Sequence, residues 1–424
     1  MRARGAGDGP PRFFWNARRL ECKKENRRMP AAKDHPRFPK EEYSRRYREI
    51  RKRMRARGLD VLVMYGDSGS HGGNQASIKY VTNYQDPVSS FAVFPLKGEP
   101  ALYISNRLYL PYAKQMSVFG RTEAVDYDPG AKVERRIREL GLEKGAIGVV
   151  GYRGILKTSI PFSVMDHWRR ALPGASFAEA TELLHEVRAV KSKEELKWFR
   201  RGAALTDMAF EALEKMARPG MTDYELAAIV SNAYMPSGGG QQLIFIGSTS
   251  MARPHLIFPN QFPTHRRTRK GDIVLTELSA GYHMHSGQAH RPISVGAGPT
   301  PVYRRLYEVA VEAYERILRA VKPGANQDDV RRAGSIIGEE GFTTFDTTFH
   351  GWGLLIENPR VDVDATLIER PQNEIVFREG MLMVIQPNLV TPDSKGGLQV
   401  GNLVEVTKNG ARSLQKFPMK FMRI

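Results

Sequence analysis

The chain has 424 residues, and its 64 Lys and Arg against 46 Asp and Glu give a formal net charge of +18. Its single cysteine, Cys22, excludes an intramolecular disulfide and a zinc site of four thiolates, which predicts a reducing, cytoplasmic setting. No apolar stretch approaches the ~20 residues that span a bilayer, so no membrane association is expected.

The positive charge is concentrated at the N-terminus. Residues 1–57 hold 20 Lys and Arg against 7 Asp and Glu, and the rest of the chain is nearly balanced. Residues 1–39 are basic and contain prolines, so we expect a disordered extension, with Met29 as an alternative start. Clustered arginine also suits an arm that binds nucleic acid or an acidic membrane. No recognised motif accompanies it, so nucleic acid is not an expected partner.

Residues 40–190 alternate between helical and strand patterns. An amphipathic helix is predicted at Tyr43–Arg57, ended by Gly58, and a strand at Leu59–Tyr65. Further strands are predicted at Ile78–Val81, Phe91–Leu96, Pro100–Ile104 and Ala146–Tyr152, and helices at Ala131–Leu140 and Pro161–Ala171. This alternation predicts an α/β domain with helices covering a sheet.

A second domain is predicted over residues 191–424. Ser192 and Glu195 form a capping box in front of a long amphipathic helix that ends at Met216. Residues 216–226 match residues 320–330 in register, 104 positions later. Each copy ends a helix, turns on a basic residue followed by Pro-Gly, and restarts a helix from Thr222 or Asn326. The repeat predicts two related halves, which commonly enclose a site.

Polar residues that could take part in catalysis or binding follow each copy of the repeat. Glu277 lies inside the apolar strand Ile273–Ser279, where an acid must be paired, protonated or functional. Three histidines lie within residues 282–291, and six of the ten lie between His255 and His350, which favours proton transfer or metal binding.

The C-terminal third adds a second set of candidates. His350 precedes a Gly-x-Gly turn, and Glu357, seven residues on, is a candidate acid partner. Gln386 ends an apolar strand over residues 380–387, and a last strand is predicted at Leu398–Thr407.

These segments together resemble the creatinase, prolidase, aminopeptidase P and methionine aminopeptidase superfamily, peptidase clan M24, over about residues 40–420. The resemblance is carried by Ala76–Tyr84, Leu184–Glu195, Arg218–Thr222, Lys270–Val274, His350–Leu354, Arg378–Met381 and Val404–Gly410. It implies an α/β (α+β) chain with a creatinase-type N-terminal domain, a pseudo-twofold pita-bread domain that holds the site, and a homodimer.

Peptidases of this superfamily hold two divalent metals with two Asp, one His and two Glu. The resemblance places these ligands at Glu277, Gln288, His350, Gln386 and Gly401, and the further family histidine at Ile356. One carboxylate and one imidazole therefore remain, too little negative charge for a pair of divalent cations. We expect no metal and no cofactor.

Creatinase is the relative that this pattern favours, because it also lacks the metal set and hydrolyses a C–N bond with a histidine acid/base. The resemblance places that histidine at His255, a residue type suited to proton transfer near neutral pH. The carboxylates that hold creatine are replaced by His290 and Gln386, so a neutral or anionic small molecule is expected instead.

Three hypotheses follow. The first is a metal-independent hydrolase or lyase in which His255 moves protons, His350 and Glu277 polarise or orient, and the substrate is bound by Gln288, His290, Arg291, Glu357 and Gln386. The second is an Xaa-Pro peptidase-like or lyase metalloenzyme with a rearranged single-metal site built from His283, His285, His290 and His350. The third is a non-catalytic binding module on the same scaffold.

Overall fold

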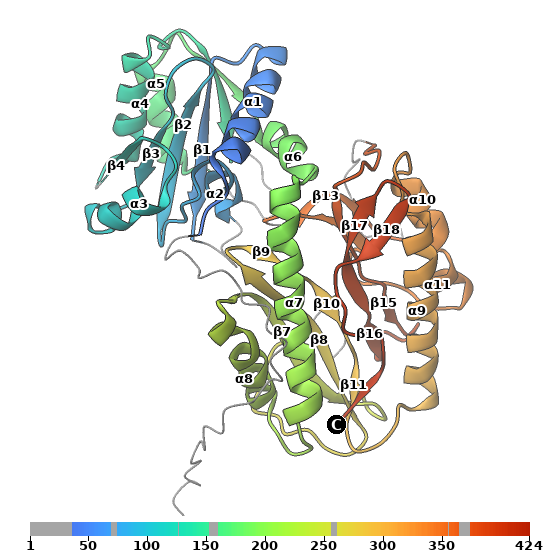
Figure 1. Ribbon diagram of the computed structural model, residues 1–424. Coiled ribbons are helices and arrows are strands. Elements are labelled where there is room, and N and C mark those ends of the chain that lie inside the picture. Colours follow the sequence, from blue (N-terminus) through green and yellow to red (C-terminus); the bar gives the residue numbers. More distant parts are fainter. Residues whose placement is uncertain are drawn as a thin grey trace, which may run out of the picture. The chain divides into compact units, whose positions relative to one another are not determined.

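The computed structural model describes residues 36–68, 74–125, 127–151, 160–255, 261–354, 356–363 and 374–424 (Figure 1). The basic extension predicted over residues 1–39 lies almost entirely outside them. Residues 37–424 form one unit. No helix in the described ranges has both the length and the apolar character to cross a membrane. The predicted boundary near Val190 falls between helices α6 and α7.

The first sheet has six strands in the order β4-β3-β2-β1-β5-β6. Its strands are β1 (Val61–Asp67), β2 (Ser89–Pro95), β3 (Ala101–Ile104), β4 (Arg121–Ala124), β5 (Ala146–Val150) and β6 (Ser176–Glu179). The helices are α1 (Lys40–Ala56), α2 (Ala76–Thr82), α3 (Leu110–Met116) after the short η2 (Arg107–Tyr109), α4 (Pro129–Glu139), α5 (Phe162–Ala171) and α6 (Thr181–Ala189).

Strand β1 shows why helices cover both faces of this sheet. Leu62 and Met64 join a core with helix α1, whereas Val61 and Val63 join the opposite core with α4 and α5. Successive side chains of a strand point to opposite faces, so an uninterrupted apolar strand needs cover on both sides. The predicted α/β domain is confirmed in this arrangement (Figure 1).

One predicted strand in this domain is wrong. Residues Ile78–Val81 lie in helix α2, which ends at Asn83 in a left-handed conformation with its N–H bonded to the Lys79 carbonyl. All four residues are buried. A short apolar run buried on every side has no period that distinguishes a strand from a helix.

The second, larger sheet has eleven strands, with the path β13-β12-β14-β17-β10-β8-β11-β19 and β18, β7 and β9 paired beside it. Its strands are β7 (Gly240–Ser250), β8 (Asp272–Tyr282), β9 (His285–Ser286), β10 (Ala289–His290), β11 (Ile293–Ser294), β12 (Phe349–Trp352), β13 (Ile356–Val361), β14 (Leu382–Ile385), β17 (Gly401–Thr407), β18 (Gly410–Ser413) and β19 (Met422–Arg423). A separate hairpin pairs β15 (Asn388–Val390) with β16 (Gly397–Gln399).

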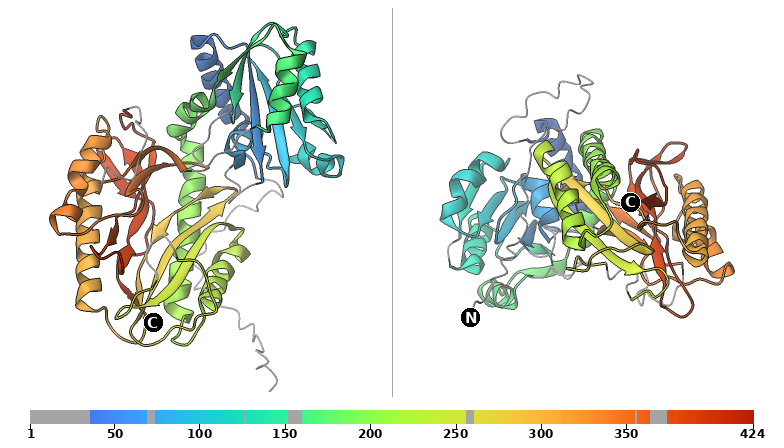
Figure 2. Two further views of the ribbon diagram at one scale, coloured as in Figure 1. Left: turned by 180° about the vertical axis from the view of Figure 1, so that it is seen from behind. Right: turned by 90° about the horizontal axis from the view of Figure 1, so that it is seen from below.

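The helices of this part are divided between its two halves. Helices α7 (Lys193–Met216) and α8 (Asp223–Tyr234), followed by η3 (Met235–Ser237), pack on β7 and β8. Helix α9 (Pro301–Ala320) packs on β14, β15, β16 and β18, next to α10 (Gln327–Gly334) and α11 (Ile336–Glu339) (Figure 2).

The internal repeat is confirmed in three dimensions. Both copies restart their helix with a complete capping box, from Thr222 to Glu225 and from Asn326 to Asp329. The glycine before each cap adopts a positive φ, 92° at Gly220 and 90° at Gly324. Glycine reaches this conformation without a steric penalty, so the Pro-Gly pair sets the same turn in both halves.

The predicted strand Leu398–Thr407 is two strands. Residues up to Gln399 pair with β15, and residues from Gly401 join the large sheet between β10 and β14. The chain changes partners at Val400, whose N–H donates to the Pro387 carbonyl at 3.2 Å. The alternation of apolar and polar residues predicts which side chains are buried, but it does not predict which strand lies next to them.

Candidate functional site

Four of the predicted site residues meet on the large sheet. Glu277 projects from β8, Gln288 precedes β10, His350 is on β12 and Gln386 follows β14. We call these four residues the amide cluster. Each is at most 8% exposed.

Hydrogen bonds join the amide cluster end to end. Gln288 Nε2 donates to Glu277 Oε1 at 2.6 Å and lies 3.4 Å from Gln386 Oε1. His350 Nε2 lies 3.3 Å from the same Gln386 oxygen. Gln386 Nε2 donates to the Thr347 carbonyl at 2.9 Å, which fixes the orientation of its amide. The central positions of the cluster are therefore filled by amide N–H donors and their acceptors.

His290 lies beside the amide cluster and is completely buried. Its Nε2 is 3.8 Å from Glu277 Oε1, and neither ring nitrogen has a hydrogen-bond partner among the described residues. His290 pairs across the sheet with Gly401, where an added Cβ would come within 2.8 Å of His290 Nδ1 and 2.4 Å of the Ile385 carbonyl oxygen. The imidazole and this backbone occupy the space that a side chain at position 401 would need.

His350 is neutral near pH 7. Burial lowers the pKa of His350 to about 4, although the Gly351 carbonyl and the charge of Glu277 act in the opposite direction. Its Nδ1 lies 3.0 Å from the Gly351 carbonyl oxygen. A neutral imidazole carries one N–H, so His350 donates in only one of its two contacts with oxygen.

Asp346, four residues before His350, was not among the site residues predicted from the sequence. Burial raises the pKa of Asp346, and the charge of Glu277 raises it further, which places the two acids within electrostatic reach. Arg360 Nη2 lies 3.8 Å from the Asp346 carboxylate. Asp346 follows a run without regular apolar spacing, so no pattern in the sequence marked it.

Arg291 was assigned to substrate binding, and the structure corrects this to a structural role. Its five N–H groups donate to the described chain at the carbonyls of Pro418, His290, Gly401 and Phe417 and at Asn402 Oδ1, all at 2.8 or 2.9 Å. A guanidinium has five donors, so none remains for a substrate.

Glu357 was also assigned to substrate binding and named as an acid partner of His350, and the contacts correct both. Arg188 Nε donates to Glu357 Oε1 at 3.1 Å and Lys191 Nζ donates to Oε2 at 2.7 Å. All three side chains are at most 3% exposed. Burial alone would raise the pKa of Glu357, but Lys191 and Arg188 hold it below its ordinary value. Glu357 is therefore the shared ion-pair partner of two buried cations.

The remaining histidines lie apart from the amide cluster. His255 is exposed and bonded through Nδ1 to Thr249 Oγ1 at 2.9 Å, and residues 256–260 that follow it lie outside the described ranges. Its role as proton shuttle stays a prediction. His283 and His285, which the single-metal hypothesis places in one site, do not lie on a continuous extended segment, because His283 and Met284 have φ values of 49° and 69° and turn the chain. His285 packs against Phe199 and Trp198, and burial lowers its pKa well below the ordinary value.

The donor set does not fit the metal pair that the resemblance implies. The amide cluster offers one carboxylate, and its Oε1 already accepts from Gln288. Among the described residues, no group of three or more His, Cys, Asp or Glu side chains is arranged to hold a metal ion. Hard divalent cations need several anionic oxygen ligands, and amide N–H groups directed at the same position oppose them.

Comparison with protein families decides the identity of the chain. The model of metallopeptidase family M24 matches residues 197–408, half of the chain, and that of the creatinase/prolidase N-terminal domain matches residues 46–190. The chain belongs to the metallopeptidase M24 family. This M24 protein is 25% identical over 325 residues to an Xaa-Pro dipeptidase of Pyrococcus horikoshii, covering 76% of this chain and 85% of the relative. It is 23% identical over 406 residues to an ectoine hydrolase of Halomonas elongata, covering 90% and 97%.

Solved structures show the same fold for this M24 protein. The prolidase of Pyrococcus horikoshii superposes with a TM-score of 0.72 at 21% identity, covering 89% of this chain and all of that one. The prolidase of Thermococcus sibiricus superposes with a TM-score of 0.76 at 19% identity, covering 92% and 100%. The creatinase-type N-terminal domain and the pita-bread domain are confirmed, and the chain is a hydrolase of this family.

Proposed function

We propose that this M24 hydrolase cleaves a C–N bond in a small polar molecule, with imidazole as the proton carrier in place of the family's metal pair. The observation that carries the proposal is the 2.6 Å hydrogen bond from Gln288 Nε2 to Glu277 Oε1. It satisfies the carboxylate of the amide cluster with a donor from the protein itself. This internal donor supports a site that works without added cations.

His290 is the best-placed proton carrier. It is buried, it lies 3.8 Å from Glu277 Oε1, and neither ring nitrogen has a hydrogen-bond partner among the described residues, so no described protein group competes with a reactant for either nitrogen. In the proposed reaction water attacks the carbon of the C–N bond while the imidazole takes a proton from that water. The proton then passes to the leaving nitrogen, which balances the hydrolysis.

Glu277 and the amides would position the reactants. The Glu277 carboxylate lies 3.8 Å from His290 Nε2, and its proposed role is to align the imidazole with the reactants. His350 is neutral, so it positions the Gln386 amide without adding charge. Two glutamines and a neutral imidazole suit a substrate that is polar but not strongly cationic, because the amide cluster itself holds one carboxylate to neutralise a cation.

The relatives support hydrolysis of a C–N bond and leave two substrate classes open. The Halomonas relative is an ectoine hydrolase, which favours a small molecule, and the chain covers nearly all of it. The Pyrococcus relatives are Xaa-Pro dipeptidases, which favours a metal-dependent peptidase as the second candidate function. The donor set of the amide cluster supports the first, because it offers one carboxylate, and Oε1 of that carboxylate already accepts a hydrogen bond from Gln288.

The test is hydrolysis of ectoine, creatine and the dipeptide Ala-Pro by the full chain, each with EDTA and with added Mn²⁺, Co²⁺ or Zn²⁺. We expect turnover of a small non-peptide substrate that EDTA leaves unchanged. His290→Asn should lower kcat by about 10²- to 10⁴-fold, the range of general acid/base catalysis. His167→Asn, on helix α5 and remote from the cluster, is the matched control.

Turnover of Ala-Pro that requires Mn²⁺ or Co²⁺ and is abolished by EDTA would establish the second candidate and reject the first. Full activity of His290→Asn would reject the assigned proton carrier. In that event His255→Asn and His350→Asn, measured in the same assay, identify which histidine moves the proton.

A further inference from the structure

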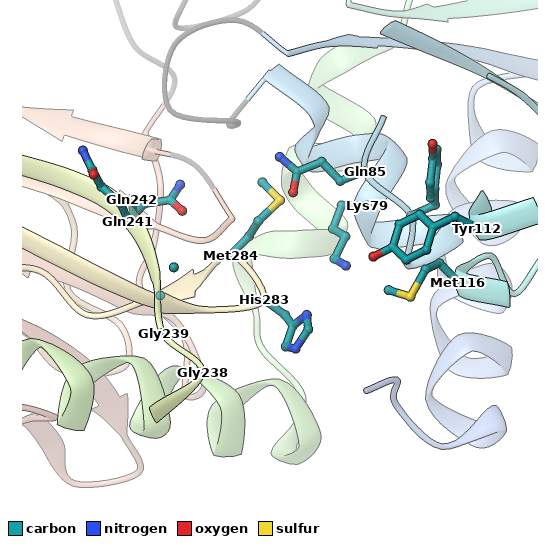
Figure 3. Close-up of a pocket in the computed structure, with 13 residues that line it drawn as sticks. Lys79, Gln85, Tyr112, Met116, Gly238, Gly239, Gln241, Gln242, His283 and Met284 are labelled. Carbon is teal, nitrogen blue, oxygen red and sulfur yellow. The ribbon is translucent and has the colours of Figure 1, made fainter. Parts of the chain in front are cut away.

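A cavity of about 660 Å³ lies away from the amide cluster. It is lined on one side by Lys79 of helix α2 and by Tyr112 and Met116 of helix α3, and on the other by His283, Met284 and Gln241 near the ends of β7 and β8 (Figure 3). We call it the lysine cavity. Its volume is typical of sites for small molecules.

The lysine cavity is distinct from the amide cluster although both contact strand β8. Glu277 belongs to the cluster, and Gly281, which lines the cavity, lies four residues further along. Four residues of a strand span roughly 13 Å. Occupancy of one site therefore does not block the other.

The charge of the lysine cavity is positive. Lys79 is 6% exposed, and among the described residues that line the cavity there is no Asp or Glu. The Lys79 ammonium donates to the Asn83 carbonyl oxygen at 2.6 Å, an uncharged acceptor. Burial of an ammonium without a carboxylate is unfavourable, and it lowers the pKa of Lys79 to about 8, with Arg46 contributing.

The acid next to the cavity lining, Asp86, already has hydrogen-bond donors of its own. It accepts from the hydroxyl group of Tyr84, which lines the cavity, at 3.3 Å, and also from the Val88 and Ser89 N–H groups and from Ser105 Oγ. A second cation, Arg201, stacks on Tyr282 at 3.7 Å and adds positive potential. Burial is the main cause that lowers the pKa of His283 to about 4, and the charges of Lys79 and Arg201 lower it further.

The rest of the lining suits the body of an organic ligand. Gln241 and Gln85 supply amides and Tyr112 a hydroxyl group, while Met116 and Met284 supply apolar surface. Gly238, Gly239 and Gly240 contribute backbone without side chains. Figure 3 shows Lys79 and Tyr112 facing His283 from the opposite side.

From this geometry we propose that the lysine cavity binds a small organic carboxylate, with Lys79 as its charged partner and the amides and thioethers around its neutral body. The inference is independent of the proposed hydrolytic function. A carboxylate would give Lys79 the anionic acceptor that the described residues lining the cavity do not supply.

The test uses N-acetylglycine and its uncharged analogue N-acetylglycinamide, with inorganic phosphate as a third probe, in calorimetric titration of the full chain. We expect saturable binding of N-acetylglycine and at least about tenfold weaker binding of the amide, the factor that 1.4 kcal/mol represents. Phosphate bound as tightly as N-acetylglycine would overturn the organic ligand class.

Lys79→Met removes the charge and keeps the length of the side chain, so it should weaken N-acetylglycine at least tenfold. The matched control is Lys114→Met, an exposed lysine of helix α3 that does not line the cavity. His283→Gln, which leaves Lys79 in place, should weaken binding less and serves if Lys79→Met fails to fold. Unchanged affinity in both cavity variants, or no saturable binding to the wild-type chain at millimolar concentration, overturns the proposal.

Discussion

Replacement of Gln288 by Glu tests the geometry of the amide cluster most directly. In the wild-type chain, Gln288 Nε2 donates to Glu277 Oε1 at 2.6 Å, and the two residues are 1% and 8% exposed. The substitution exchanges that donor for an oxygen of nearly the same size. Two buried carboxylates then face each other without a cation, so they cannot both ionise at low cost.

The expected magnitude follows from Coulomb's law. Two unit charges about 4 Å apart at an effective dielectric constant of about 20 repel by roughly 4 kcal/mol. The pair avoids this repulsion by keeping one proton, which raises one carboxyl pKa by about 3 units, since each unit is worth about 1.4 kcal/mol. The folded variant then binds more protons than the unfolded chain above about pH 4.3, so its stability falls as the pH rises.

Urea unfolding at pH 5 and pH 7.5, followed by tryptophan fluorescence, measures the effect. Trp352 reports on the same sheet, because it is buried with Nε1 bonded to the Ser286 carbonyl. The variant should lose roughly 3 kcal/mol more than wild type between the two pH values. Gln288→Leu is the matched control, whose loss of the hydrogen bond should not depend on pH. Equal stability of Gln288→Glu at both pH values would refute the direct contact with Glu277.

Three further predictions concern other parts of the structure. Gly401→Ala should cost about 1–3 kcal/mol because its Cβ would contact three neighbours at less than 3.0 Å, whereas Gly298→Ala, whose Cβ meets nothing within 4 Å, should cost little in the same urea assay. Glu357→Gln should cost about 3–5 kcal/mol by leaving two buried cations uncompensated, and a loss below 1 kcal/mol in chemical denaturation would contradict the ion pairs. Lys79 has a pKa of about 8 in the folded chain against an ordinary value of 10.5, so the unfolded chain binds more protons between these two pH values. The stability of the wild-type chain should therefore rise by roughly 3 kcal/mol from pH 8 to pH 10.5 relative to Lys79→Met. Parallel stability curves of the two proteins over this range would count against burial of the Lys79 ammonium.

The sequence alone predicted those features that depend on local chemistry. Capping boxes at Ser192, Thr222 and Asn326 were readable because a cap and its acid lie three residues apart. The repeat was readable for the same reason, and it predicted the two halves of the large domain. The positions of the amide cluster came from the family resemblance, and the structure brings all four together.

Other features were decided only by the tertiary structure. Glu357 is not available to a ligand because it pairs with Arg188, 169 positions earlier in the chain. Arg291 is not available to a substrate because its N–H groups donate to carbonyls that include two more than 100 positions later. The short run Ile78–Val81 became a helix because burial on all sides removes the periodicity that separates helix from strand. The lysine cavity is lined by segments that are distant in the sequence. No local pattern in the sequence predicts that Lys79 is buried in a lining whose described residues include no acid. Spacing along the chain fixes local geometry, whereas charge compensation is settled only where the folded segments meet.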